Sequence, residues 1–156
     1  MAVKPIPDGY PRVIPYLSID GAADAIEFYT NVLGAKERMR MPGPDGKIGH
    51  AELDIGDGVV MLADPFDPEM GGTRSAREIG DTPVTVMVYV EDVDEIYKRA
   101  LDNGAKQVGE GVQNQFYGDR SGSFIDPFGH KWHIATHVED VSPEDMEKRM
   151  KEMMGG

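Results

Sequence analysis

The sequence contains no cysteine, and this absence excludes several kinds of chemistry at once. Without thiols the chain has no disulfides, no cysteine nucleophile and no thiolate ligands for zinc. It also lacks any apolar run close to the roughly 18 residues of a membrane-spanning helix, and its start, Met1 to Pro5, lacks the apolar core of a signal peptide. We therefore expect a cytoplasmic protein with no membrane partner.

Basic residues are scarce relative to acidic ones. Lys and Arg total 16 against 28 Asp and Glu, which gives a formal net charge of -12 at pH 7 and a pI near 4.6. A surface of that charge repels nucleic-acid phosphates, so nucleic acid is not an expected partner. A length of 156 residues is sufficient for one domain with its own core, or for two half-domains that share one sheet.

An internal repeat organises the chain. Residues 14–36 are echoed by residues 85–106, and each copy reads as a strand, an acidic turn, an amphipathic helix and a Gly-Ala-Lys exit. The first helix is expected to end at Gly34, which suits a left-handed residue. The second is expected to begin at Asp92, with Glu95 completing a capping box, and to close at Gly104. The pattern predicts two related modules.

Strands, rather than further helices, follow each predicted helix. The six expected strands are Ala35 to Met41, Ile48 to Ile55, Val59 to Ala63, Lys106 to Val108, Gln115 to Ile125 and Lys131 to Thr136. The order βαβββ therefore occurs twice. We expect an α+β fold in which the two modules form a curved mixed sheet with helices on the convex side, leaving a concave face for a small molecule.

Three segments complete the predicted organisation. A single domain covers residues 10–140, made of modules 10–64 and 83–138. Residues 65–82, rich in Pro, Gly and Asp, are expected to form a linker loop, with a lid as the alternative. Residues 141–156 should form a C-terminal helix with an apolar stripe of Met146, Met150 and Met153, which favours packing on the same chain or in a homodimer.

The segment from Gly118 to His137 concentrates the candidate chemistry. Asp126-Pro127-Phe128-Gly129 predicts a tight turn between two antiparallel strands. Along the second strand, alternation places Trp132 with the core and His133 on the opposite face.

These motifs resemble those of a known superfamily. Ala25-Ile26-Glu27-Phe28-Tyr29, Val32-Leu33-Gly34-Ala35 and the late stretch from Asp126 to Trp132 are similar to the vicinal oxygen chelate superfamily, which includes glyoxalase I, extradiol dioxygenases, fosfomycin-resistance enzymes and bleomycin-binding proteins. Pro15-Tyr16-Leu17 leading into Asp20-Gly21 resembles its PhnB-like branch. The resemblance covers about residues 10–140 and implies a glyoxalase-like fold, but one scaffold hosts many chemistries.

The resemblance also implies where a divalent metal would be bound. The ligand positions of the glyoxalase-like enzymes fall at Ile14, Met61, Thr85 and His133, of which only His133 is a good ligand. We therefore expect no metal of the usual layout and no other cofactor. The alternative is a two-His-one-carboxylate centre of His50, Glu52 and His133, which suits non-haem iron.

The remaining candidates are polar side chains expected on the concave face. His50, Glu52 and Asp54 alternate with apolar neighbours, although alternation is also common on exposed strands. His133 is the candidate catalytic residue, as a general base, or is simply satisfied by a nearby carboxylate. Arg120 is expected to bind an anionic ligand, or to hold its loop through Asp119. The predicted ligand-binding residues are Tyr16, His50, Glu52, Thr85, Tyr89, Tyr117 and Arg120.

Three functions stay open from these observations. The first is a small-molecule-binding protein of this superfamily that lacks the usual metal. The second is an enzyme, a metal-dependent lyase, isomerase or dioxygenase. The third is a resistance protein that sequesters a drug, as the bleomycin-binding proteins in the resemblance imply.

Overall fold

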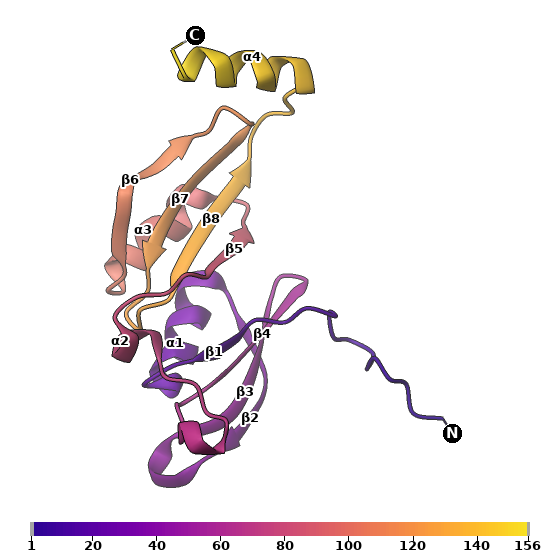
Figure 1. Ribbon diagram of the computed structural model, residues 1–156, viewed down its shortest axis with the longest axis vertical. Helices are drawn as coiled ribbons and strands as arrows, with labels where there is room; N and C mark the ends of the chain where they lie inside the picture. The colour runs from indigo at the N-terminus through magenta and orange to yellow at the C-terminus, as the bar shows by residue number, and fades with distance from the viewer. Residues whose placement is uncertain (1, 156) are drawn as a thin grey trace. The chain divides into compact units, whose positions relative to one another are not determined.

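The computed structural model describes residues 2–155 and divides the chain into two compact units, Met1–Thr82 and Pro83–Gly156. Each unit has its own four-stranded sheet (Figure 1). None of the helices in the described part of the chain has the length and hydropathy that a membrane crossing requires.

The first unit is a βαβββ module. It contains β1 (Tyr16–Ser18), α1 (Ala22–Leu33), β2 (Lys36–Pro42), β3 (Ile48–Ile55) and β4 (Gly58–Ala63), with a short 3-10 turn, η1 (Pro44–Gly46), before β3. The sheet order is β1-β4-β3-β2, in which β1 runs parallel to β4 and the other neighbours are antiparallel.

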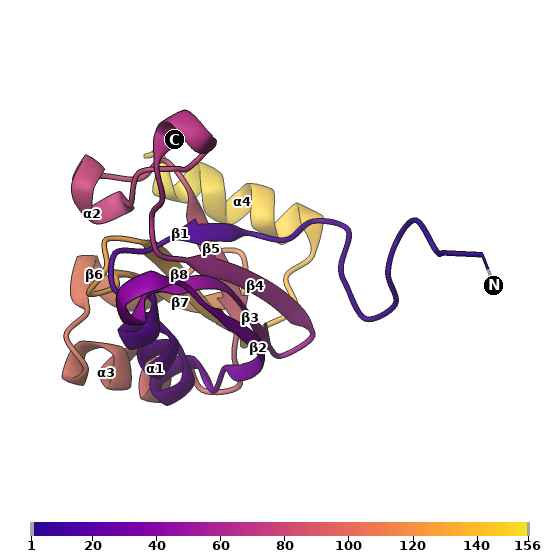
Figure 2. The ribbon, with the colours of Figure 1, turned by 90° about the horizontal axis from the view of Figure 1, so that it is seen from below.

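Helix α1 covers one face of the first sheet. Its buried stripe follows the helical period, and in both views the helix lies on one side of the strands (Figures 1 and 2). The predicted end is confirmed, since Gly34 adopts φ 66° and its N–H bonds to the carbonyl of Tyr29. The buried helix residues are Ala22, Ala25, Ile26, Phe28, Tyr29, Val32 and Leu33.

The second unit repeats the plan of the first. It contains β5 (Thr85–Tyr89), α3 (Val93–Asp102), β6 (Lys106–Asn114), β7 (Asp119–Ile125) and β8 (Lys131–His137), in the order β5-β8-β7-β6. The predicted cap of α3 is confirmed, because Asp92 Oδ1 accepts from the N–H of Glu95 at 3.1 Å. The doubled βαβββ pattern and the α+β class are therefore confirmed.

Three local predictions differ from the structure. The strand expected over Lys106 to Val108 continues to Asn114 as β6. The segment between the modules carries two short helices, η2 (Pro68–Met70) and α2 (Ala76–Ile79), the second capped by Ser75 through the N–H of Glu78. The strand expected from Gln115 begins only at Asp119, because residues 115–118 form a turn in which Gly118 takes φ 105°.

The turn between β7 and β8 is built on one buried carboxylate. Asp126 accepts hydrogen bonds from the N–H groups of Phe128 and His130 and from the indole of Trp132, at 2.9, 3.0 and 2.9 Å. Trp132 is fully buried, and Gly129 takes φ 94°. The predicted hairpin and the inward direction of Trp132 are confirmed.

The C-terminal helix α4 (Pro143–Met153) also forms as predicted. Ser142 Oγ accepts from the N–H of Asp145 at 3.2 Å. Arg149 holds the helix to the chain through Glu139 and the carbonyl of Phe116. None of the described α4 side chains is fully buried: Met146 is half-buried, whereas Met150 and Met153, the rest of the methionine stripe, are exposed.

Candidate functional site

The sheet face opposite α1 carries the polar candidates of the first unit. In β3, Ala51, Leu53 and Ile55 are buried towards the helix, so His50 and Glu52 project from the other face. The register pairs Glu52 with Met61 and Met61 with Tyr16, which brings three strands together on this open face.

Glu52 is the centre of a hydrogen-bonded chain on the open face. Its side chain accepts from Tyr10 at 2.8 Å through Oε2, while Oε1 lies 3.0 Å from His50 Nε2. The other nitrogen of His50, Nδ1, lies 2.7 Å from the hydroxyl of Tyr16. The hydrogen bond from His50 is the main reason that the pKa of Glu52 lies below 4.5, so this carboxyl is ionised at neutral pH although only 5 % of the residue is exposed.

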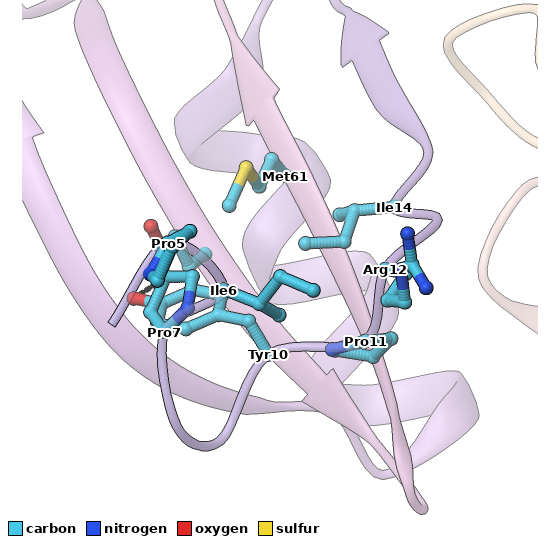
Figure 3. A pocket seen from close by; sticks show the side chains of 9 residues that line it. Pro5, Ile6, Pro7, Tyr10, Pro11, Arg12, Ile14 and Met61 are labelled. Atoms are coloured by element: carbon cyan, nitrogen blue, oxygen red, sulfur yellow. Dashed lines mark hydrogen bonds between the residues drawn. The ribbon is translucent and has the colours of Figure 1, made fainter.

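Residues 2–15, which we name the N-terminal arm, cover part of this face and create a pocket. The pocket has a volume of about 640 Å³, and seven of its nine lining residues belong to the arm (Figure 3). Glu52 and Met61 are the two lining residues from the sheet, and we refer to the cavity as the arm pocket. The arm residues that line it are Pro5, Ile6, Pro7, Tyr10, Pro11, Arg12 and Ile14.

Arg38 supports the arm from the sheet. Its guanidinium carbon lies 4.3 Å from the centre of the Tyr10 ring, a cation–π arrangement, and its Nε lies 3.7 Å from Asp54 Oδ1. Nη1 of Arg38 is buried without a hydrogen-bond partner among the described residues. Tyr10 is thus held at both ends, by Glu52 at its hydroxyl and by Arg38 over its ring.

The second unit has its own open face. Thr85, Tyr89 and His133 share it, because β5 pairs with β8 in the register Met87 to His133, and Ser123 lies opposite His133 on β7. His133 Nδ1 lies 2.8 Å from Ser123 Oγ. Its catalytic role remains a prediction.

A second hydrogen-bonded chain lies at the end of this face. Asp119 is buried, accepts from the hydroxyl of Tyr89 at 2.8 Å, and lies 2.8 Å from Nδ1 of His137, whose Nε2 is 2.8 Å from Asp140. Burial by itself raises the pKa of Asp119, but the hydrogen bonds from His137 and Tyr89 outweigh it, and the pKa falls below 3.8. Asp140, and then Asp119, raise the pKa of His137 above 6.5.

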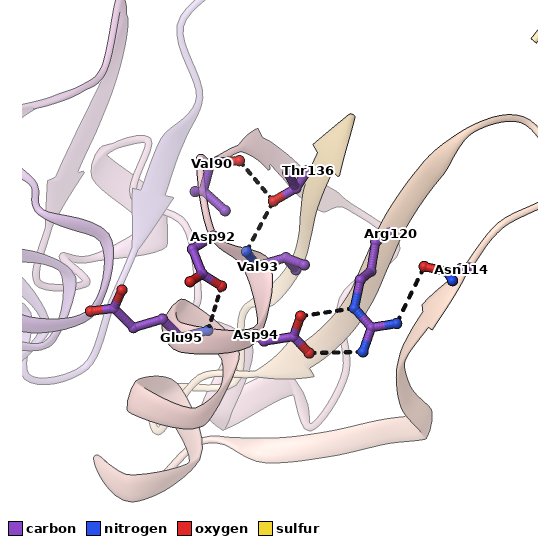
Figure 4. Close-up of polar contacts among 8 residues, drawn as sticks. All are labelled: Val90, Asp92, Val93, Asp94, Glu95, Asn114, Arg120 and Thr136. Carbon is purple, nitrogen blue, oxygen red and sulfur yellow. Dashed lines mark hydrogen bonds and ion pairs between the residues drawn. The ribbon is translucent and has the colours of Figure 1, made fainter. Parts of the chain in front are cut away.

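Arg120 lies on a different face from the one we expected. Its side chain binds Asp94 on α3 through two hydrogen bonds of 2.8 and 2.9 Å and contacts Asn114 at 3.3 Å (Figure 4). In β7 it alternates with Asp119 and Ser121, so it shares the helix-covered face with Phe124. The ion pair with Asp94 replaces the expected pairing with Asp119, and each of the three guanidinium nitrogens of Arg120 already donates one hydrogen bond.

The structure therefore groups the predicted site residues into separate sets. Tyr16, His50 and Glu52 form one connected group in the first unit, and Thr85, Tyr89 and His133 lie on one face of the second. Tyr117 lies in the turn before β7 and packs edge-on against Phe116. Sequence reasoning did not find the arm, for which the signal was four prolines and a tyrosine between Pro5 and Pro15.

Comparisons with known proteins agree with this architecture. The profile described as "Glyoxalase/Bleomycin resistance protein/Dioxygenase superfamily" matches residues 15–134. The chain belongs to this superfamily. A protein of Mycobacterium bovis described as uncharacterized is 41% identical over 148 residues, which cover 94% of this chain and 96% of that one.

Several solved structures have a similar fold. TioX from Micromonospora sp. ML1 is 27% identical, with a TM-score of 0.62 over 85% of this chain and 100% of that one. A PhnB protein from Bacillus cereus, described as a putative 3-demethylubiquinone-9 3-methyltransferase, is 14% identical, with a TM-score of 0.63 over 81% of this chain and 99% of that one. At that identity the likeness concerns the fold alone.

The four positions that the resemblance assigns to the metal ligands carry side chains that offer few donor atoms to a divalent metal. Ile14 offers no donor atom, Met61 offers a weak and soft one, and Thr85 offers a neutral hydroxyl. His133 is the good ligand of the set, and its Nδ1 is engaged by Ser123. Among residues 2–155 no group of three or more His, Cys, Asp or Glu side chains is arranged to hold a metal ion.

Proposed function

We propose that this member of the superfamily binds a small organic molecule in the arm pocket and does so without the usual divalent metal. The observation that carries the proposal is the pocket itself. Its volume of about 640 Å³ falls inside the range of roughly 300–1,000 Å³ that is typical of ligand sites. Its lining combines apolar side chains with the polar groups of Tyr10, Arg12 and Glu52, and polar groups at fixed positions orient a ligand.

The polar groups of the pocket favour a ligand that donates hydrogen bonds near Glu52 and offers an acceptor or a negative group near Arg12. Glu52 is ionised and buried, and the Tyr10 hydroxyl already donates to it, so both present oxygen lone pairs to the cavity. Three of the lining residues are prolines, which have no backbone N–H to offer. Apolar contact with Ile6, Ile14 and Met61 would supply most of the binding free energy.

Binding is tested with a library of aromatic and heteroaromatic fragments added to isotope-labelled protein. We expect hits to shift the NMR signals of Tyr10, Ile14 and Met61, and we expect Met61→Trp to abolish those shifts by placing a bulky ring in the cavity. Met87→Trp, on the open face of the second unit, is the matched control and should leave them unchanged. If no fragment perturbs the pocket, or if hits survive in Met61→Trp, the arm pocket is not the binding site.

The metal-dependent alternative makes an opposite prediction about purified protein. A lyase, isomerase or dioxygenase that uses His50, Glu52 and His133 would contain Fe, Zn or Ni. Elemental analysis that finds one such metal per chain, lost in His133→Ala, would replace the metal-independent proposal. We expect only substoichiometric metal that His133→Ala does not change.

We also infer that the protein is a homodimer that covers the methionine stripe of α4. A short helix is marginal unless its apolar side is buried, and in one chain Met150 and Met153 are exposed. Light scattering should give twice the chain mass, and deletion of residues 142–156 should give the monomer mass. An unchanged mass after the deletion would remove α4 from the interface.

A further inference from the structure

The two units contain hydrogen-bonded chains of the same three kinds of side chain, with the histidine and the carboxylate exchanged. In the first unit the order is tyrosine, histidine, carboxylate, from Tyr16 through His50 to Glu52. In the second unit it is tyrosine, carboxylate, histidine, from Tyr89 through Asp119 to His137. The phenol of Tyr16 therefore faces an imidazole, whereas the phenol of Tyr89 faces a carboxylate.

We propose that Tyr16, His50 and Glu52 form a proton relay that makes the phenol oxygen of Tyr16 a base-assisted nucleophile toward activated carboxylic esters. This reactivity lies on the surface beside the arm pocket, and it does not depend on which ligand the pocket takes. The phenol oxygen of Tyr16 attacks the ester. His50 accepts its proton, and Glu52 positions His50.

The hydrogen bonds define the direction of the relay. Glu52 is ionised and can only accept, so Nε2 of His50 carries the hydrogen that points to it. In the neutral imidazole Nδ1 is then the acceptor, and it lies 2.7 Å from the Tyr16 oxygen. A carboxylate that fixes the tautomer of a base in contact with a hydroxyl is the arrangement by which a nucleophile is activated.

The access and the resting state of Tyr16 are consistent with this role. Tyr16 is 53 % exposed, so the side chain can be reached from solution, while Glu52 behind the relay is buried. Burial, and then the charge of Glu52, raise the pKa of Tyr16 above 10. The phenol is therefore protonated before reaction, and its attack depends on a base that removes the proton as the bond forms.

Tyr89 provides the matched control inside the same molecule. It is 61 % exposed and donates a hydrogen bond of similar length, 2.8 Å, to Asp119. The pKa of Asp119 is below 3.8, so its carboxylate is a far weaker base than an imidazole. A difference in reactivity between the two tyrosines thus reports on the base and not on exposure.

With 4-nitrophenyl acetate as the ester, the bonds formed and broken in the proposed step are as follows. The Tyr16 oxygen forms a bond to the acetyl carbonyl carbon, and the bond from that carbon to the 4-nitrophenolate oxygen breaks. The phenol proton passes to Nδ1 of His50, and the imidazolium is held by Glu52 until it releases the proton to water. The products are O-acetyl-Tyr16 and 4-nitrophenolate.

The test follows acetylation of each tyrosine of the full-length protein by mass spectrometry of its peptides. General base assistance typically contributes about 100-fold or more, so Tyr16 should react about 100-fold faster than Tyr89 in the unaltered protein. His50→Gln should reduce the Tyr16 rate to within a few fold of the Tyr89 rate, and Glu52→Gln should reduce it about 10-fold by loosening His50. His130→Gln, in the turn of the β7–β8 hairpin, should change neither rate.

The comparison within the unaltered protein decides the outcome even if a variant folds poorly. Equal rates at Tyr16 and Tyr89 would overturn the relay. So would a burst of 4-nitrophenolate in Tyr16→Phe as fast as in the unaltered protein, because a side chain other than Tyr16 would then be the nucleophile. Neither result would affect the proposal for the arm pocket, which the fragment experiment tests separately.

Discussion

The hydroxyl of Tyr10 donates to Oε2 of Glu52 at 2.8 Å, which joins the N-terminal arm to the open face of the first sheet. The two residues are 42 positions apart in the chain, and one hydrogen bond between them defines a wall of the arm pocket. Because the acceptor is ionised and buried, losing the donor leaves a charged oxygen short of a partner.

Removing that donor should therefore loosen the arm. We expect Tyr10→Phe to lower the free energy of unfolding by about 1 kcal/mol, below the range for fully buried charged hydrogen bonds because the contact is only partly buried. Hydrogen exchange of residues 5–12 should accelerate. Tyr117→Phe is the control on the second unit, and equal exchange in the two variants would show that the bond does not hold the arm.

The carboxylate of Glu52 should make the thermal stability of the protein decrease at acidic pH. The pKa of Glu52 is lowered by folding, so its contribution is fully present above its unfolded pKa, near 4.5, and is lost as pH falls through the lower folded value. We expect the melting temperature to drop more steeply below about pH 4.5 in the natural protein than in Glu52→Gln. Parallel melting curves for the two proteins between pH 7 and pH 3 would contradict this.

His137 should show the opposite dependence. Its pKa is raised by Asp140 and Asp119, so its contribution is present below pH 6.5 and is lost as pH rises through the folded pKa. An NMR titration of the ring should give a midpoint above 6.5. The stability difference between the natural protein and His137→Gln should shrink as pH is raised. A midpoint at or below 6.5 would show that the contacts of His137 with Asp119 and Asp140 do not raise its pKa.

Asp126 should be among the more costly side chains to remove. Its carboxylate satisfies two backbone N–H groups and the buried indole of Trp132, and each buried donor left unpaired costs about 1–3 kcal/mol. Urea unfolding of Asp126→Ala should show a loss of about 3 kcal/mol. Asp57→Ala, in the exposed turn between β3 and β4, should lose about 0.5 kcal/mol or less, as exposed positions usually do.

The features that could be predicted from the sequence depend on local chemistry. The cap at Asp92, the left-handed Gly34 and the alternation along residues 48–55 each follow from neighbours within a few positions. The same alternation placed Glu52 and His50 on one face. The helix and strand periodicities were sufficient to predict the two modules, because the internal repeat shows the same pattern twice.

The features that the sequence did not predict depend on long-range register. The face of Arg120 is set by where β7 begins and by its pairing with β8, and the turn at residues 115–118 delays the strand to Asp119. Asp94, its partner, is 26 positions away. The contact between Tyr10 and Glu52 has no local pattern either, so the arm pocket emerges only from the three-dimensional structure.

Metal-independent binding in the arm pocket is tested most directly by the dissociation constant of one fragment hit, measured before and after the protein is stripped with a chelator. The account predicts the same constant in both samples, an unchanged constant in Arg120→Ala, whose donors bind Asp94, and no measurable binding in Met61→Trp. Binding that disappears on chelation and returns with Zn, Fe or Ni would contradict it.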